Sequence, residues 1–259
     1  MISPGTISQR IHDVLSGQAG DRQVEEVRIG LGYVGVMLTS DHMGVAAVLR
    51  DELRPGCSTI GKAGTLAGSP ASDLLDLVVK GTNPLEKALG LATANALLRP
   101  DPSEEMEQDS IALMDLTTAD RVAMVGYFGP LVQRIRRTGA TLRIIEKDSR
   151  RTDDILDQEE RDRILADCSV GIITATSILN NTIEDLLNGL GSPRHVTVLG
   201  PSTPMCEEAF AETPVTHLGG SAIRDPQKIM QIISEGGGTP HMRPHLFFID
   251  RMVDPHANR

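Results

Sequence analysis

Two glycines and a proline in the segment Gly126–Pro130 have the spacing of a turn that could hold a small anion. Gly126 allows a tight turn and Gly129 lets the backbone approach a ligand. Pro130 starts a helix whose free N–H groups favour negative charge. Glu146 follows Gly126 by 20 residues, at the end of the next apolar run, where a carboxylate could bind a ribose diol. A plain strand-to-helix turn with a surface glutamate explains the same residues, so both interpretations stay open.

Three further polar turns share this design, each between an apolar run and a helical pattern. They are Asn180–Thr182, Gly200–Pro204 and Gly219–Pro226. In any one of them the hydroxyl or amide could simply cap the helix that follows. If the strands are parallel, however, the turns converge at one edge of the sheet. The lining of N–H donors and small side chains then predicts a site for a small anionic or polar ligand.

Cys206 is the best single candidate for a metal ligand. It lies two residues into a predicted helix that begins at Pro204, where the helix dipole is expected to lower its pKa. The neighbouring Met205 is also a soft donor, so the pair suits a thiophilic metal. One thiolate cannot complete a site, and the sequence has no C-x-x-C pair. The alternatives are a small buried cysteine, or a metal chelated by the bound ligand itself.

The glycine-rich loop around Gly56–Ala63 is one residue short of a phosphate-binding loop. Ala63 stands where the magnesium-binding hydroxyl is needed, and no buried strand precedes the loop. ATP hydrolysis is therefore not expected, and a flexible loop that folds over a ligand is the better interpretation. No G-x-S-x-G or H-E-x-x-H motif occurs, and nothing selects a catalytic acid or base, so an enzymatic activity is left open.

The elements of the first part of the chain predict an α+β unit. A helix is expected at 7–15, followed by strands at 24–29, 33–39 and 43–50. The breaks between the strands are short, which favours antiparallel hairpins. Helices at 71–79 and 84–98 follow, the second with Asn83 as its N-cap and Pro84 at its first position. The polar, proline-containing segment 99–108 then predicts a linker.

The second part alternates short apolar runs with helical patterns. Strands are expected at 122–125, 141–145, 170–174, 195–199 and 215–218, and helices at 130–137, about 154–166, 182–190, 204–211 and 226–234. Each run is continuous, as in strands buried on both faces. The alternation predicts a parallel sheet with helices on both faces, whose ligands bind beyond the carboxyl ends of the strands.

Composition excludes several classes of protein. The net charge of −10 has no basic cluster to offset it, and aromatic residues make up 2%, so no nucleic-acid partner is expected. Three dispersed cysteines do not suggest a disulfide framework. There is neither a signal-like start nor an apolar run of membrane-spanning length. We therefore expect a cytoplasmic protein without a membrane partner.

Several motifs together resemble the putative heavy-metal-chelation family, which joins an enolase N-terminal-like domain to a Rossmann-like domain. They are Asn83–Ala92 with Asn95–Leu97, Val125–Phe128, Thr174–Thr182 and Gly200–Pro204. The resemblance implies an enolase-like α+β domain over residues 1–105 and a Rossmann-like α/β domain over residues 106–259. It also implies a site in the cleft between them, and it does not carry over enolase chemistry.

Three functions remain open. The first is a ligand-binding or metal-handling protein. The second is a Rossmann-type enzyme with a nucleotide-like cofactor such as S-adenosylmethionine. The third is a subunit, such as part of a homo-oligomer, whose ligand regulates assembly. The residues expected to bind the ligand are Gly126, Tyr127, Phe128, Gly129, Glu146, Thr176, Asn180, Asn181, Thr182, Gly200, Pro201, Ser202 and Thr203, with Cys206 for a metal.

Overall fold

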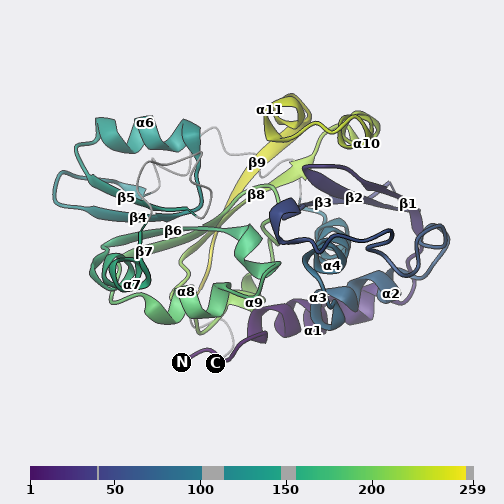
Figure 1. Cartoon of the computed structure of the whole chain (residues 1–259), viewed down its shortest axis with the longest axis horizontal. Helices are drawn as coiled ribbons and strands as arrows, with labels where there is room; N and C mark the ends of the chain where they lie inside the picture. The colour runs from purple at the N-terminus through teal and green to yellow at the C-terminus, as the bar shows by residue number, and fades with distance from the viewer. Residues whose placement is uncertain (40, 101–113, 147–155, 255–259) are drawn as a thin grey trace.

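A computed structural model describes residues 1–39, 41–100, 114–146 and 156–254 (Figure 1). Its first sheet is antiparallel and consists of β1 (Val24–Ile29), β2 (Tyr33–Leu38) and β3 (Met43–Ala47), in that order. The predicted three-stranded meander is therefore confirmed. The predicted linker lies, from residue 101 onward, outside the described residues, and the division of the chain at residue 105 stays a prediction.

The helix α4 (Pro84–Leu98) covers one face of this small sheet, and α1 (Thr6–Ala19), α2 (Ala71–Leu75) and α3 (Leu77–Lys80) pack against α4. The short 3-10 helix η1 (Arg50–Glu52) follows β3 in the chain. The α4 helix starts as predicted, because the Asn83 side chain accepts bonds from two backbone N–H groups of its first turn. It packs so closely on β3 that a Cβ at Gly44 would lie 2.2 Å from the Ala92 carbonyl oxygen.

The large sheet has six strands in the order β5-β4-β6-β7-β8-β9. The strands are β4 (Arg121–Val125), β5 (Thr141–Ile145), β6 (Val170–Thr174), β7 (His195–Leu199), β8 (His217–Ile223) and β9 (Leu246–Met252). The first five are parallel, and β9 is antiparallel to β8. The mixed α/β fold is thus confirmed, with an antiparallel last strand that the βα alternation did not predict.

The helices of the large sheet lie on both of its faces. The α6 helix lies on the opposite side of the strands from α7 and α8 (Figure 1). The elements are α6 (Gly129–Arg137), α7 (Gln158–Asp167), η3 (Ala175–Ile178), α8 (Ile183–Gly189), α9 (Glu207–Phe210), α10 (Pro226–Ser234), α11 (Thr239–Met242) and η4 (Arg243–His245). Two expectations were wrong: β8 continues through Gly219–Ser221, which were expected in a turn, and α9 starts at Glu207 instead of Pro204.

The hydrophobic core joins the two parts of the chain. Its main cluster combines side chains of α1, β2 and α4 with side chains of β7 and α8. A second cluster packs Met37 and Val45 of the small sheet against Ile229 and Ile233 of α10, on the sheet face that α4 leaves uncovered. The two faces of β2 and β3 are therefore buried, whereas β1 is buried only at Val24. Among the described residues, no helix is long and apolar enough to cross a membrane.

Candidate functional site

The turn after β4 lies where the order of the large sheet reverses. The chain leaves β4 toward β5 on one side and returns to β6 on the other, which is the point where doubly wound sheets bind ligands. Gly126 has a φ of 88° and its N–H group donates to the Ile145 carbonyl oxygen at 2.9 Å. A Cβ at Gly126 would lie 3.0 Å from Cβ of Thr174, at the end of β6. The turn therefore needs glycine for both its conformation and its packing.

This turn brings several of the predicted site residues together. The Phe128 ring lies 3.9 Å from where a Cβ of Gly200 would be, so the turns after β4 and β7 are neighbours. Tyr127 is 40% exposed beside them. Glu146 is half-buried and follows Ile145, whose carbonyl oxygen accepts the bond from the Gly126 N–H group. Gly126, Phe128, Glu146 and Gly200 thus lie around the carboxyl ends of β4, β5 and β7.

The turn after β6 is held by its own hydroxyl groups. The hydroxyl oxygens of Thr174 and Thr176 are 3.0 Å apart, and the Thr182 hydroxyl donates to the Asn180 side chain at 2.8 Å. Asn181 has a φ of 56°, in the left-handed region that asparagine tolerates. Thr182 makes no side-chain bond to the α8 backbone, so the capping explanation does not apply to it.

Two charged residues from the first part of the chain reach this turn. Lys87 of α4 donates from Nζ to Oδ1 of Asn181, and Glu52 of η1 accepts a bond from the Asn180 amide at 3.0 Å. Lys87 is 9% exposed, and burial lowers the pKa of its amine while the charge of Glu184 partly opposes that shift. Lys87 is not among the site residues that the sequence predicts. The available signal was a single lysine on an otherwise apolar stretch of α4.

Glu184 places a carboxylate in the same region. Its side chain is 2% exposed on α8, and Oε1 accepts a bond from the Ile7 N–H group at 3.0 Å. Oε2 is buried and has no hydrogen-bond partner among the described residues. A buried carboxylate oxygen without a donor costs free energy, so this oxygen is a point at which a ligand or water could bind.

The turn after β7 faces the small sheet. The Ser202 hydroxyl oxygen accepts a bond from the Ala47 N–H group at 2.8 Å, and Asn95 donates to the carbonyl oxygens of Val45 and Ser202. Ser202 and Thr203 are both 2% exposed, and Oγ1 of Thr203 has no partner within the described part of the chain. The Ser202 hydroxyl therefore joins the turn to the small sheet, and no side chain caps α9.

A family model described as putative heavy-metal chelation (DUF364) matches residues 109–248, which is more than half of the chain. The chain belongs to this family. A second model with the same description (DUF4213) matches residues 12–98. Among curated proteins, an uncharacterised protein of Methanocaldococcus jannaschii is 23% identical over 231 residues, covering 86% of this chain and 88% of the relative.

Two solved structures of DUF364 proteins, both described as having unknown function, share the fold. The protein of Pyrococcus horikoshii superposes with a TM-score of 0.82 at 21% identity, over 95% of this chain and 100% of that one. The protein of Desulfitobacterium hafniense gives 0.77 at 20% identity, over 94% and 99% of the two chains. Identities this low establish the shared fold alone.

The described residues of this DUF364 protein do not fit a heavy-metal ion held by the protein alone. Cys206 is 1% exposed, and burial raises the pKa of its thiol to about 12, the opposite of the expected shift. It precedes the first residue of the four-residue α9 helix instead of lying inside a longer one. His217 stacks on His195 with ring centroids 4.1 Å apart. Nowhere in the described ranges do three or more His, Cys, Asp or Glu side chains form a group that could hold a metal.

Proposed function

We propose that this DUF364 protein binds a small organic ligand with a negatively charged group, at the carboxyl ends of β4, β6 and β7. The observation that supports this most strongly is Lys87. A buried ammonium group is costly unless a negative charge or several acceptors compensate it. Its hydrogen-bond partner is the neutral amide of Asn181, and Glu184 acts on it only as a more distant charge. A ligand carboxylate or phosphate at Lys87 would supply the missing compensation.

The surrounding backbone suits the same kind of ligand. The turn at Gly126 precedes the nine-residue α6 helix, whose N-terminus has no side-chain cap. Free N–H groups at a helix N-terminus attract anions. Such a ligand would lie between these N–H groups and Lys87. We place the site between the two parts of the chain for this reason, because α4 provides the lysine and the large sheet provides the turns.

We extend the proposal to heavy metals in one form, in which the ligand carries the metal. The family description points to chelation, whereas Cys206 is a buried, protonated thiol. Oxygen or nitrogen donors on an organic chelator would hold the metal. The protein would bind the charged group of the chelator through Lys87 and backbone N–H groups. The chain's own residues then bind and orient the ligand without acting as metal ligands.

The test begins with native mass spectrometry and elemental analysis of freshly purified protein, which report retained ligand, retained metal and subunit number. Calorimetric titrations then compare Cd²⁺ alone, the chelator dipicolinate alone, and the two together. We expect binding only when dipicolinate is present, and a weakening of about tenfold or more in Lys87→Met, since a charge-assisted bond is lost. Lys228→Met, which removes an exposed lysine of α10, is the matched control.

Two results would contradict this proposal. Equal dipicolinate affinity in Lys87→Met and the unmodified protein would remove Lys87 from the site. Tight binding of Cd²⁺ alone, lost in Cys206→Ser, would replace the ligand-borne metal with a protein-bound one. The first conclusion requires a correctly folded Lys87→Met protein and the second a correctly folded Cys206→Ser protein, so the melting temperatures of both variants are measured in the same series.

The alternative function is an enzyme that uses a nucleotide-like cofactor such as S-adenosylmethionine. The observation that favours it is Glu146, which follows β5 and adjoins the Gly126 turn as a ribose-binding carboxylate would. Titration with S-adenosylmethionine tests it, with Glu146→Gln as the variant. Binding that is lost in Glu146→Gln would favour this function over the first.

A further inference from the structure

The outer edge of β1 exposes backbone groups that no neighbouring strand uses. Gly30 N–H donates to the Tyr33 carbonyl oxygen at 2.9 Å, which fixes the register of the β1–β2 hairpin. Because bonded and non-bonded pairs alternate along an antiparallel ladder, Arg28 bonds to β2, and Val27 and Ile29 point their N–H and C=O groups outward. No bond from these outward groups to another part of the chain occurs within the described residues.

The same edge already pairs with an extended segment at its other end. Val24 N–H donates to the Ser69 carbonyl oxygen at 2.9 Å, and Gly68 N–H donates to the Val24 carbonyl oxygen at 2.7 Å. Gln23 and Pro70 form an antiparallel bridge there. The end of the glycine-rich loop thus acts as a short additional strand, and pairing stops before Val27.

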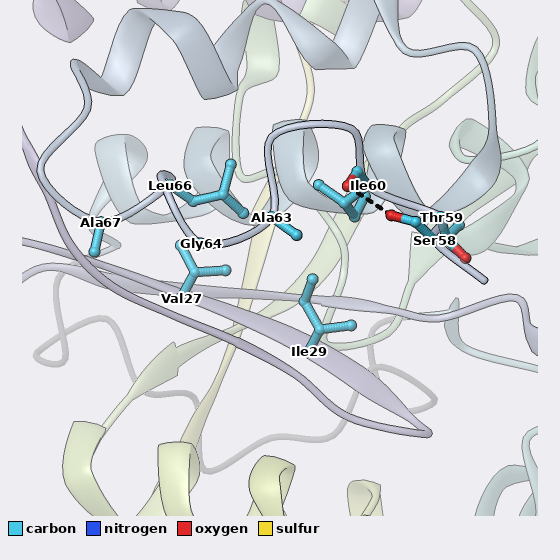
Figure 2. Close-up of a pocket in the computed structure, with 9 residues that line it drawn as sticks. All are labelled: Val27, Ile29, Ser58, Thr59, Ile60, Ala63, Gly64, Leu66 and Ala67. Atoms are coloured by element: carbon cyan, nitrogen blue, oxygen red, sulfur yellow. Dashed lines mark hydrogen bonds between the residues drawn. The ribbon is translucent and has the colours of Figure 1, made fainter.

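An apolar pocket adjoins the unpaired part of the edge. Figure 2 shows Val27 and Ile29 pointing from β1 toward the loop. A pocket of about 540 Å³ lies between these two side chains and the loop. Nine residues line it, none of them charged: Val27, Ile29, Ser58, Thr59, Ile60, Ala63, Gly64, Leu66 and Ala67. Ile29 is 43% exposed and Leu31, beyond it, is 63% exposed, so apolar surface continues past the pocket.

The glycines of the loop over the pocket have open space around them. Gly64 and Gly68 have φ values of 89° and 84°, and a Cβ at Gly61, Gly64 or Gly68 would touch nothing within 4 Å. These glycines are therefore not required by packing against the rest of the chain. The loop is anchored at Gly68 and Ser69 by the bonds to Val24, and Thr65 bonds to the Lys62 carbonyl oxygen within it.

We infer that this edge and pocket bind an extended peptide segment that carries a branched aliphatic side chain. The peptide backbone would bond to the outward groups of Val27 and Ile29, continuing the pairing that Gly68 and Ser69 begin. Side chains of an added strand alternate in direction, so one of them would enter the pocket. A partner protein with an exposed strand or tail is the source of such a segment. The site is separate from the one proposed at Lys87.

The test uses the whole protein with ¹³C-labelled isoleucine and valine methyl groups. The probe is the blocked peptide acetyl-Thr-Ile-Thr-amide, and two matched peptides accompany it. One carries N-methylated isoleucine, which cannot donate to the edge, and the other replaces isoleucine with aspartate. We expect the first peptide to shift the Val27 and Ile29 methyl signals in NMR spectra. The aspartate peptide should bind about tenfold or more weakly, since burial of an isoleucine side chain is worth that factor. The N-methylated peptide should bind about threefold to tenfold more weakly, because it loses one backbone hydrogen bond to the edge.

Pocket-filling variants complete the design. Ala63→Trp and Ala67→Phe enlarge exposed alanines that line the cavity, and Ala119→Trp enlarges an exposed alanine outside it. The first two should lose peptide binding and the third should keep it, with melting temperatures confirming that each variant folds. Absence of methyl shifts in the unmodified protein would overturn the inference. Equal affinity for the N-methylated peptide, or unchanged binding in both pocket variants, would overturn it as well.

Discussion

The stacked pair of His195 and His217 predicts that the protein loses stability in mild acid. Both side chains are buried, at 5% and 8% exposure, and their ring centroids are 4.1 Å apart. Burial lowers the pKa of both, and for His195 the value falls from 6.5 to about 4, with the neighbouring His217 as a second cause. Each imidazole is therefore neutral in the folded protein at pH values where the unfolded chain is already protonated.

The sign and size of the effect follow from proton linkage. The unfolded chain binds more protons than the folded one between pH 6.5 and about 4, so the free energy of unfolding falls as the pH falls through this window. One pKa unit corresponds to about 1.4 kcal/mol, so the full shift of His195 is worth about 3 kcal/mol. That is a large part of the 5–15 kcal/mol typical of the stability of folded domains.

Urea unfolding at pH 7.5, 6.5, 5.5 and 4.5 measures this loss. The variant His195→Gln removes the titrating group, so its stability should change less between pH 6.5 and 4.5 than that of the unmodified protein. His241→Gln, which changes an exposed histidine, should retain the full dependence. If His195→Gln and the unmodified protein show the same pH dependence, the buried imidazole is not the cause and the reasoning is refuted.

Two further predictions concern single residues. Gly126→Val should reduce the free energy of unfolding by about 2–3 kcal/mol in urea titrations, since valine is strained at a φ of 88° and its Cβ would lie 3.0 Å from Thr174. Gly17→Ala, at a position of α1 with open space around it, should instead raise the free energy of unfolding by about 0.5–1 kcal/mol. Similar changes in Gly126→Val and Gly17→Ala would count against the packing argument. At pH 8, iodoacetamide should modify exposed Cys57 much faster than buried Cys206; mass spectrometry showing equal rates would contradict a buried thiol of raised pKa.

The fold was predictable where local signals and tertiary structure agree. The hairpin breaks of the small sheet and the continuous apolar runs of the large one placed eight strands. The last strand, Leu246–Met252, was not predicted although Leu246–Ile249 is an apolar run. It follows α11 and η4 and returns antiparallel to β8, so the βα alternation gave it no position.

Only the part of the candidate site that the turns of the large sheet provide was predictable. Gly126 and Glu146 were predicted because a strand-to-helix turn, and the spacing from it to the end of the next strand, can be recognised in the local sequence. Lys87 was missed because its partner, Asn181, is 94 residues away and no local pattern links the two. For Cys206 the expected direction of the pKa shift was wrong, because burial outweighs the dipole of a four-residue helix.

Because α10 packs on the small sheet, the two parts of the chain are not expected to fold when they are expressed separately. Two family models describe residues 12–98 and 109–248 separately, yet Met37 and Val45 of the first segment are buried by Ile229 and Ile233 of the second. A fragment that ends near residue 100 is expected to aggregate, because this apolar face of the sheet would be exposed to water. We therefore expect the two segments to fold only together, like the halves of a split protein.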